Sequence, residues 1–275
     1  MAALVLLAGC GQVQIQGGTL RKDPNAKLIS LSPSTTEIVE LTQMNQRLIG
    51  RTDADNGQVV SKVPVVVRNT KPDYEAITAA KPDIILYDST IFSDLDTEKL
   101  KSTGAELFDF KAKNFKEFED SLWKLTSRIG GEAWVSEYID RIYIAREKYQ
   151  GGMEGGEVKV MALMGGSGEY MAVGRQSILA EIMSFAGGTP VGPDSDKFTT
   201  MGAEQIVASA PEIIFTPGQA DQILSDPRLQ SVPAVKGRRV YDVNANYLLR
   251  TGQRVHDLIG AMGDQILNYK TAKNK

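Results

Sequence analysis

The stretch EAITAAKPDIIL at residues 75–86 recurs as EQIVASAPEIIF at residues 204–215, which is 129 residues further along the chain. Both copies follow E-x-I-x-A-x-x-P-[DE]-I-I plus an apolar residue, and six of the twelve positions are identical without a gap. The proline is expected to end a short helix, and the apolar run after it suits a buried strand. Convergence of helix–Pro–strand junctions is the alternative explanation, but it does not require a glutamate at the same offset. The repeat therefore predicts two similar lobes in one chain.

Around the first copy, short apolar strands alternate with helices. Strands are expected at residues 27–31, 48–50, 63–67, 84–87 and 106–108, with a short helix at 98–103. The segment Ser34-Thr35-Thr36-Glu37 has the form of a capping box, which would begin a helix carrying Ile38, Leu41 and Met44 on its apolar side. Such alternation is typical of an α/β lobe built on a largely parallel sheet.

Residues 114–150 differ, because they have a helical pattern that is broken only near Gly130 and Gly131. The second segment carries one stripe at helical spacing, made of Trp134, Tyr138, Ile142, Ala145 and Tyr149. Twenty residues of helix would span about 30 Å, so we expect this segment to join two lobes rather than to form a coiled coil. Beyond it the alternation restarts, with strands at 158–164, 212–215 and 239–241 and helices at 178–186 and 254–269.

The predicted fold is α/β, with two Rossmann-like lobes joined by a single long helix and a ligand cleft between the lobes. The expected divisions are residues 1–26 for a lipoprotein signal and tether, 27–113 for the N-terminal lobe, 114–152 for the linking helical segment and 153–275 for the C-terminal lobe. A single stiff helix is a poor hinge, so we expect the lobes to close only slightly.

The composition excludes several classes of protein. A net charge of −3 argues against sequence-independent nucleic-acid binding, which needs clustered Lys and Arg. No apolar run approaches the roughly 20 residues that span a bilayer. With one Cys and one His, the chain has no internal disulfide and no Cys- or His-rich metal cage. We therefore expect no bound metal and no cofactor.

The N-terminal apolar segment ends at the only cysteine. Leu7-Ala8-Gly9-Cys10 resembles the lipobox of bacterial lipoproteins, in which the signal peptide is removed and the cysteine is acylated. The segment is short and no Lys or Arg precedes it, so we expect the printed chain to begin at an internal methionine. Residues 11–23 would then form a flexible tether. The alternative is a frayed apolar terminus with an incidental cysteine.

The stretch LISLSPSTTEI at residues 28–38 resembles the opening strand and helix of periplasmic binding proteins for cobalamin, ferric siderophores and haem. Residues 74–85, 177–188, 204–214 and 250–254 are similar to later landmarks of that family, so the resemblance covers roughly residues 27 to 270. It implies two α/β lobes joined by a rigid helix, with the ligand between them.

The resemblance also implies a function. The chain would be the substrate-binding lipoprotein of an ABC importer, with no enzymatic activity, lipid-anchored at the periplasmic or extracellular face of the cell envelope. It would deliver a metal chelate (a corrinoid such as cobalamin or a ferric siderophore, with haem a weaker candidate) to a permease dimer. Glu75 and Glu204 would form salt bridges to the two permease subunits, a role that symmetric charged residues suit.

The sequence departs from the family where cobalamin binders carry aromatic residues. Residues 51–57 contain neither an aromatic residue nor proline, and Arg68-Asn69 stands where Trp is often found. Phe198, six residues before Glu204, does match an aromatic position of the cleft. These differences leave a more polar or anionic chelate open.

Loops at the ends of sheet strands are expected to line the cleft. Arginine would bind carboxylates or phosphates there, aromatic rings would stack on a flat ligand face, and a tyrosine could ligate haem iron, although nothing selects one. The candidate ligand contacts are Ser32, Ser34, Arg68, Asn69, Tyr87, Asp88, Ser167, Tyr170, Phe198, Tyr247 and Arg250.

Two other functions stay open at this point. Gly165-Gly166-Ser167-Gly168 partly resembles a hydrolase nucleophile elbow, but Glu169 stands where the second glycine should be and His256 is the sole available base. The Asp53–Asp55 and Asp194–Asp196 pairs could bind a hard cation, although solvated loop charges are the simpler interpretation. The other alternative is a lipid-anchored scaffold or adhesion protein without a ligand.

Overall fold

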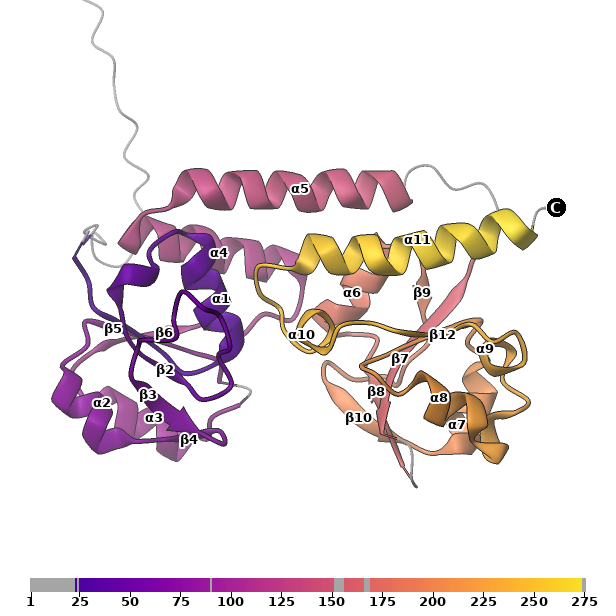
Figure 1. The fold of residues 1–275 in the computed structure, drawn as a ribbon, viewed down its shortest axis with the longest axis horizontal. Helices are drawn as coiled ribbons and strands as arrows, with labels where there is room; N and C mark the ends of the chain where they lie inside the picture. The colour runs from indigo at the N-terminus through magenta and orange to yellow at the C-terminus, as the bar shows by residue number, and fades with distance from the viewer. Residues whose placement is uncertain (1–22, 24, 90, 151–155, 166–168, 274–275) are drawn as a thin grey trace, which may run out of the picture.

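The computed structural model describes residues 23, 25–89, 91–150, 156–165 and 169–273, and these residues form two six-stranded sheets, one in each of two lobes (Figure 1). The first sheet has the order β4-β3-β2-β1-β5-β6 and is parallel except for the β3–β4 pair. Its strands are β1 Leu28–Ser30, β2 Leu48–Thr52, β3 Val65–Arg68, β4 Lys71–Pro72, β5 Ile84–Tyr87 and β6 Glu106–Asp109.

The second sheet is mixed rather than largely parallel. Its order is β10-β8-β7-β11-β12, with β9 beside β7, and the β7–β8 and β8–β10 pairs are antiparallel. Its strands are β7 Lys159–Gly165, β8 Tyr170–Val173, β9 Thr189–Pro190, β10 Phe198–Met201, β11 Ile213–Thr216 and β12 Val240–Asp242. Strands β4, β8, β9 and β10 were not expected from the sequence; β4 and β9 have only two residues each, too few for a periodic pattern.

The sequence repeat is a structural repeat. Its helices are α2 (Tyr74–Ala80) and α7 (Ala203–Ser209), and both end on a residue in the left-handed region, Lys81 at φ 49° and Ala210 at φ 47°. The acidic position after the proline also has one role in both lobes. Asp83 accepts a hydrogen bond from the Lys27 backbone N–H (2.7 Å), and Glu212 accepts one from the Lys159 backbone N–H (3.0 Å). The predicted two-lobe α/β fold is confirmed.

The first helix, α1 (Pro33–Leu41), begins two residues earlier than the capping-box prediction. Its N-cap is Ser32, whose hydroxyl accepts from the Thr35 backbone N–H (3.3 Å). Pro33 occupies the first helical position, where its fixed φ suits a helix and its missing N–H costs nothing. The prediction of Ser34 as N-cap with Glu37 as its partner was therefore wrong, and Glu37 lies buried within the helix.

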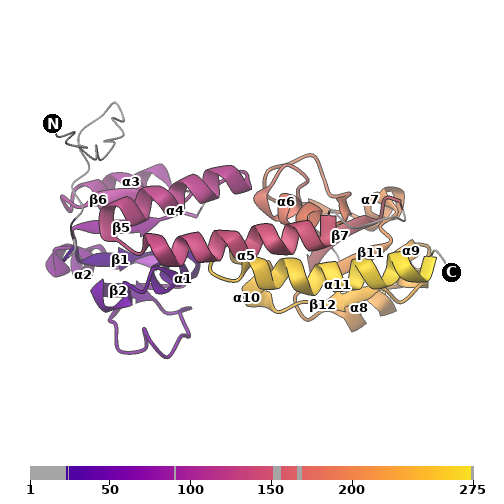
Figure 2. The same cartoon turned by 90° about the horizontal axis from the view of Figure 1, so that it is seen from above.

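The segment between the sheets forms two helices, α4 (Phe115–Ile129) and α5 (Glu132–Gln150). They meet at Gly130 and Gly131, which have φ of 90° and 95°. Figure 2 shows α5 running over both lobes, beside the closing helix α11 (Val255–Lys273). The predicted stripe was wrong at one position: Trp134 is 47% exposed, and Val135 is buried in its place.

One hydrophobic core crosses from lobe to lobe through these helices. On β5, Ile84 and Leu86 face this shared core, while Ile85 and Tyr87 face a separate cluster beneath α2. The same alternation holds on β11, since Phe215 joins the shared core and Ile214 joins a cluster beneath α7. Each sheet is thus covered on both faces, and α2 and α7 lie on the faces away from α5 (Figure 1).

The other helices are short and cover the sheets. They are α3 Asp94–Lys101, α6 Ile178–Phe185, α8 Ala220–Ser225, α9 Pro233–Lys236 and α10 Ala245–Leu248, with 3-10 turns at Asn45–Arg47 and Pro227–Leu229. Within the ranges given above, none of the helices is both long and apolar enough to cross a bilayer.

Candidate ligand-binding site

A cavity of about 320 Å³ lies between the lobes, near the lower end of the range of about 300–1,000 Å³ typical of ligand pockets. The first lobe lines it with residues that follow the carboxyl ends of parallel strands β1, β5 and β6, where open α/β sheets bind ligands. These residues, with Phe118 of α4, are Ser32, Ser34, Thr35, Ile38, Asp88, Ile91, Phe110, Ala112 and Phe118.

The second lobe supplies the opposite wall from three places. One is the start of α6, one is the approach to β10, and one is the loop between α10 and α11. The residues are Ser177, Ile178, Leu179, Asp196, Lys197, Phe198, Leu248, Leu249 and Thr251. Two segments more than 200 residues apart in sequence, β1–α1 and the α10–α11 loop, therefore meet at this cavity.

Much of the cavity surface is apolar. Ile91 from the first lobe and Leu249 from the second are 48% and 46% exposed, although both are large aliphatic residues. Phe110 and Phe118 lie deeper, and Phe198 is half-buried at the second wall. Exposed apolar side chains gathered in one concave site mark a binding surface. A ligand with an apolar face fits this lining.

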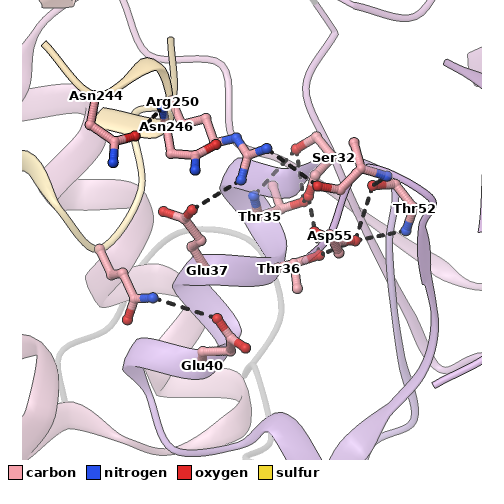
Figure 3. Close-up of polar contacts among 12 residues, drawn as sticks. Ser32, Thr35, Thr36, Glu37, Glu40, Thr52, Asp55, Asn244, Asn246 and Arg250 are labelled. Atoms are coloured by element: carbon pink, nitrogen blue, oxygen red, sulfur yellow. Dashed lines mark hydrogen bonds and ion pairs between the residues drawn. The ribbon is translucent and has the colours of Figure 1, made fainter. Parts of the chain in front are cut away.

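A network of hydroxyl groups stiffens the first wall (Figure 3). The buried Asp55 carboxylate accepts from the Thr52 backbone N–H (2.7 Å) and from the hydroxyl groups of Thr52 (3.0 Å) and Thr36 (3.1 Å). The Thr36 hydroxyl oxygen also lies 2.8 Å from the Ser30 hydroxyl oxygen, within hydrogen-bond distance. Burial raises the pKa of Asp55, and these hydrogen bonds oppose the shift. Asp55 is thus a buried structural acceptor and not the solvated loop charge that the sequence favoured.

The structure brings four of the predicted ligand contacts to the cavity and places the others elsewhere. Ser32, Ser34, Asp88 and Phe198 line it. Outside the lining, Tyr87 and Tyr170 lie in hydrophobic cores, Arg68 and Asn69 are exposed at the β3–β4 turn, Tyr247 packs against the shared core, and Arg250 pairs with Glu37. Ser167 and the proposed lipidation site Cys10 lie outside the described residues.

Sequence reasoning missed most of the apolar lining. Phe110 directly follows β6, so the strand-end rule that selected Asp88 would also have selected Phe110. Ile38 and Phe118 lie on helices, where helical periodicity assigns apolar residues to the core. Leu248 and Leu249 reach the cavity only because the α10–α11 loop returns to the first lobe, which no local pattern indicates.

Polar contacts also join the lobes directly beside the cavity (Figure 3). Arg250 of the α10–α11 loop donates to Glu37 of α1 (3.3 Å) and to the Ala54 carbonyl (3.3 Å), and Gln253 donates to Glu40 (3.5 Å). Burial raises the pKa of Glu37, although Arg254 and Arg250 oppose the shift.

The described residues contain no group of three or more His, Cys, Asp or Glu side chains that could hold a metal ion. The single histidine, His256, packs edge-on against Tyr138 of α5, with ring centroids 5.9 Å apart. Asp194 accepts from Arg175 and Gln176. Neither His256 nor Asp194 lines the cavity.

Comparison with known proteins agrees with this geometry. A family profile described as periplasmic binding protein matches residues 28–247. An uncharacterized ABC transporter substrate-binding lipoprotein of Bacillus subtilis, YvrC, is 23% identical, covering 97% of this chain and 94% of its own. The vitamin B12-binding protein of Vibrio vulnificus is also 23% identical, covering 86% of this chain and 88% of its own.

Solved structures share the fold. The periplasmic vitamin B12 binding protein BtuF of Vibrio cholerae superposes with a TM-score of 0.77 at 20% identity, covering 90% of this chain and 98% of its own. The periplasmic haem binding protein HutB of Vibrio cholerae gives 0.76 at 14% identity, covering 89% of this chain and 99% of its own. At these identities the likeness establishes the two-lobe fold.

Proposed function

The chain belongs to the periplasmic binding protein family, whose members bind solutes and are not enzymes, and we propose that it captures a metal chelate and delivers it to an ABC importer. The observation that carries the proposal is the cavity between the lobes, which is largely apolar and edged by hydroxyl and charged groups. Relatives named for vitamin B12 binding and for haem uptake support a metal-containing ligand. We propose Ser32, Ser34, Asp88 and Phe198 as ligand contacts.

The lining favours a chelate that encloses its metal over haem. Haem-binding proteins hold the iron through an axial His, Cys, Met or Tyr. None of these residue types is among the described residues that line the cavity. A corrinoid or a hexadentate ferric siderophore brings the metal ligands with it and needs only shape, apolar contact and a few hydrogen bonds from the protein.

The charges at the cavity favour a chelate that is not strongly anionic. Arg250, which the sequence offered as an anion contact, is engaged by Glu37, and Arg68 lies outside the lining. The charged residues that do line the cavity are Asp88, Asp196 and Lys197. One cation against two carboxylates gives little attraction for a multiply charged anion, which supports a corrinoid over an anionic siderophore.

We also propose that Glu75 and Glu204 dock the loaded protein on the permease. Both lie in the first turn of a repeat helix and are exposed, and neither has a polar partner among the described residues. Their helices, α2 and α7, occupy equivalent places in the two lobes (Figure 1). Two equivalent carboxylates, one per lobe, match a two-fold symmetric permease with a basic pocket on each subunit. Acylation at Cys10 would hold the protein at the outer face of the membrane.

The test is a titration of the protein with cobalamin, haem and a panel of ferric siderophores, followed by tryptophan fluorescence. Trp123 packs against the shared core on α4, the helix that also brings Phe118 to the cavity. We expect saturable binding of one self-ligated chelate, with a rise in melting temperature that follows mass action. Absence of binding to every compound would reject the metal-chelate proposal and favour another solute or a scaffold.

A further inference from the structure

A buried ion pair connects the lobes at the cavity. The Glu37 side chain, on α1, is 6% exposed, and the Arg250 side chain, on the α10–α11 loop, is 17% exposed. Arg250 Nη1 donates to Glu37 Oε1, and Arg250 Nη2 donates to the carbonyl of Ala54 in the loop after β2. The side chain thus spans two segments of the first lobe (Figure 3).

The backbone around Arg250 is fitted closely to this pair. A Cβ atom at Gly252 would lie 2.4 Å from Glu37 Oε2 and 3.1 Å from Glu37 Cβ, so any larger residue here would force the Glu37 carboxylate to move. The Gly252 carbonyl accepts a hydrogen bond from the Tyr138 hydroxyl (2.5 Å) on the buried face of α5. The loop is therefore held between α1 and the helix that joins the lobes.

Stability alone does not explain the pair. Removing two charges from water costs several kcal/mol, and apolar side chains of similar volume often serve as well or better. Glu37 Oε2 is buried and has no hydrogen-bond partner among the described residues, so the carboxylate is only partly compensated. A contact that is costly and geometrically specific, and that joins two lobes, is better understood as one that fixes their arrangement.

The pair lies beside the cavity and joins the segments that form its two walls. Ile38, next to Glu37, and Thr35, two residues before it, line the first wall, while Leu249 and Thr251 flank Arg250 and line the second. We propose that the Glu37–Arg250 pair is an interlobe latch that sets the spacing of these walls and thereby the thickness of ligand that the cleft accepts. The latch concerns the protein itself, and only its effect on ligand affinity rests on the proposed function.

The direct test measures the distance between the lobes. Spin labels at Ala79→Cys and Ala208→Cys, in a Cys10→Ser background, would occupy equivalent exposed positions on α2 and α7. We expect a narrow distance distribution for this protein and a broader one after Glu37→Gln, Arg250→Gln or Gly252→Ala. The double variant Glu37→Gln/Arg250→Gln should broaden it no further than either single variant, because both remove one contact. Arg250→Lys, which keeps the charge, should restore part of the narrow distribution.

The matched control is Glu106→Gln. It removes a partly buried ion pair to Arg128 that joins β6 of the first sheet to α4. It should lower stability and leave the interlobe distance unchanged. If Glu37→Gln does not fold, Gly252→Ala and Arg250→Gln still test the latch. Unchanged distributions in every folded latch variant, or equal broadening in the control, would overturn it.

A second arm uses cobalamin as the probe. In the latch variants we expect its affinity to fall roughly tenfold through lost preorganisation, with no change in Glu106→Gln. If cobalamin does not bind the unsubstituted protein, the proposed ligand fails while the distance measurement still decides the latch. If it binds all variants equally although the distances broaden, the proposed control of ligand thickness is wrong.

Discussion

At the scale of single residues, the chain places two buried carboxyl groups and a half-buried one close together at the interlobe contact. Burial raises the pKa values of Glu37, Glu40 and Asp55, and Arg250 and Arg254 only partly oppose the shift at Glu37. These groups are costly to ionise where they lie. The free-energy cost of ionising them is consistent with a role in fixing how the two lobes are arranged. The pH dependence of stability is therefore a sensitive probe of the interlobe contact.

Glu37 should make stability fall as pH rises. A carboxyl group with a raised pKa binds its proton more tightly in the folded state, so its contribution is complete below the unfolded pKa and is lost as pH rises through the folded pKa. The protein should therefore lose stability relative to Glu37→Gln between about pH 4 and pH 7. Urea unfolding of both proteins at the two pH values measures this. If the unsubstituted protein instead gained stability relative to Glu37→Gln as pH rises, the ion pair would more than offset the cost of burying the Glu37 carboxylate.

Phe198 should contribute to ligand affinity. Removing one stacking aromatic ring typically costs about 0.5–1.5 kcal/mol beyond lost contact area, so Phe198→Ala should weaken cobalamin binding by roughly tenfold. Calorimetric titration measures the change. Trp134→Ala, which removes an exposed aromatic side chain on α5 outside the cavity, is the matched control. Equal affinities of Phe198→Ala and the unsubstituted protein would remove Phe198 from the site.

At the scale of elements, the repeat separates structural residues from available ones. Its second acidic residue, Asp83 or Glu212, caps a neighbouring strand, whereas its first, Glu75 or Glu204, is exposed and unpartnered among the described residues. One sequence pattern thus contains a structural requirement and a candidate docking function. In the sequence alone both acidic positions are repeated equally, so the sequence does not distinguish the structural position from the exposed one.

The stability of the protein should depend on Asp83 and Glu212 but hardly on Glu75 and Glu204. Asp83→Ala removes the acceptor of an exposed backbone N–H, which water can then bind, and should cost about 0.5–1.5 kcal/mol in unfolding free energy. Glu212→Ala should cost more, because Glu212 also binds Tyr269 and Lys273. Glu75→Gln and Glu204→Gln should change stability by less than about 0.5 kcal/mol. Denaturant unfolding distinguishes these cases, and a large loss in either glutamine variant would assign that glutamate a structural role.

The joint between α4 and α5 can be tested with two glycines. Gly131 and Gly104 both have positive φ, but a Cβ at Gly131 would lie 2.6 Å from the Thr42 carbonyl oxygen, whereas a Cβ at Gly104 would meet nothing within 4 Å. Gly104→Ala should show only the backbone strain of about 1 kcal/mol. Gly131→Ala should cost clearly more, as measured by thermal unfolding. Equal losses of stability in Gly131→Ala and Gly104→Ala would mean that the α4–α5 joint can move away from Thr42 at no further cost.

At the scale of the whole molecule, the repeat predicted two lobes and the long helical pattern predicted their junction. The lining of the cleft was less predictable, because it combines loops that are distant in sequence. Side-chain direction also matters: Tyr87 ends β5 facing a core and Asp88, one residue later, lines the cavity. The α10–α11 loop and the Glu37–Arg250 pair could not be inferred, since nothing local to Arg250 indicates a partner on α1.

Because the core is continuous across both lobes, the protein should unfold as one unit. Leu28 of the first sheet and Val160 of the second belong to the same buried cluster. We expect a single calorimetric transition in which the calorimetric and van't Hoff enthalpies agree. Two separated transitions would show that the lobes are energetically independent and that the junction is weaker than its packing indicates.

The central claim is that the cleft between the lobes binds a chelate that carries its own metal ligands. Equilibrium dialysis against cobalamin, haem and ferric siderophores, with the unsubstituted protein and with Ser34→Trp, tests it most directly. Ser34 lines the cavity, so a tryptophan there should obstruct it. We expect saturable binding of a self-ligated chelate that is lost in Ser34→Trp. Binding of none of them, binding of haem alone, or binding that Ser34→Trp leaves intact would contradict it.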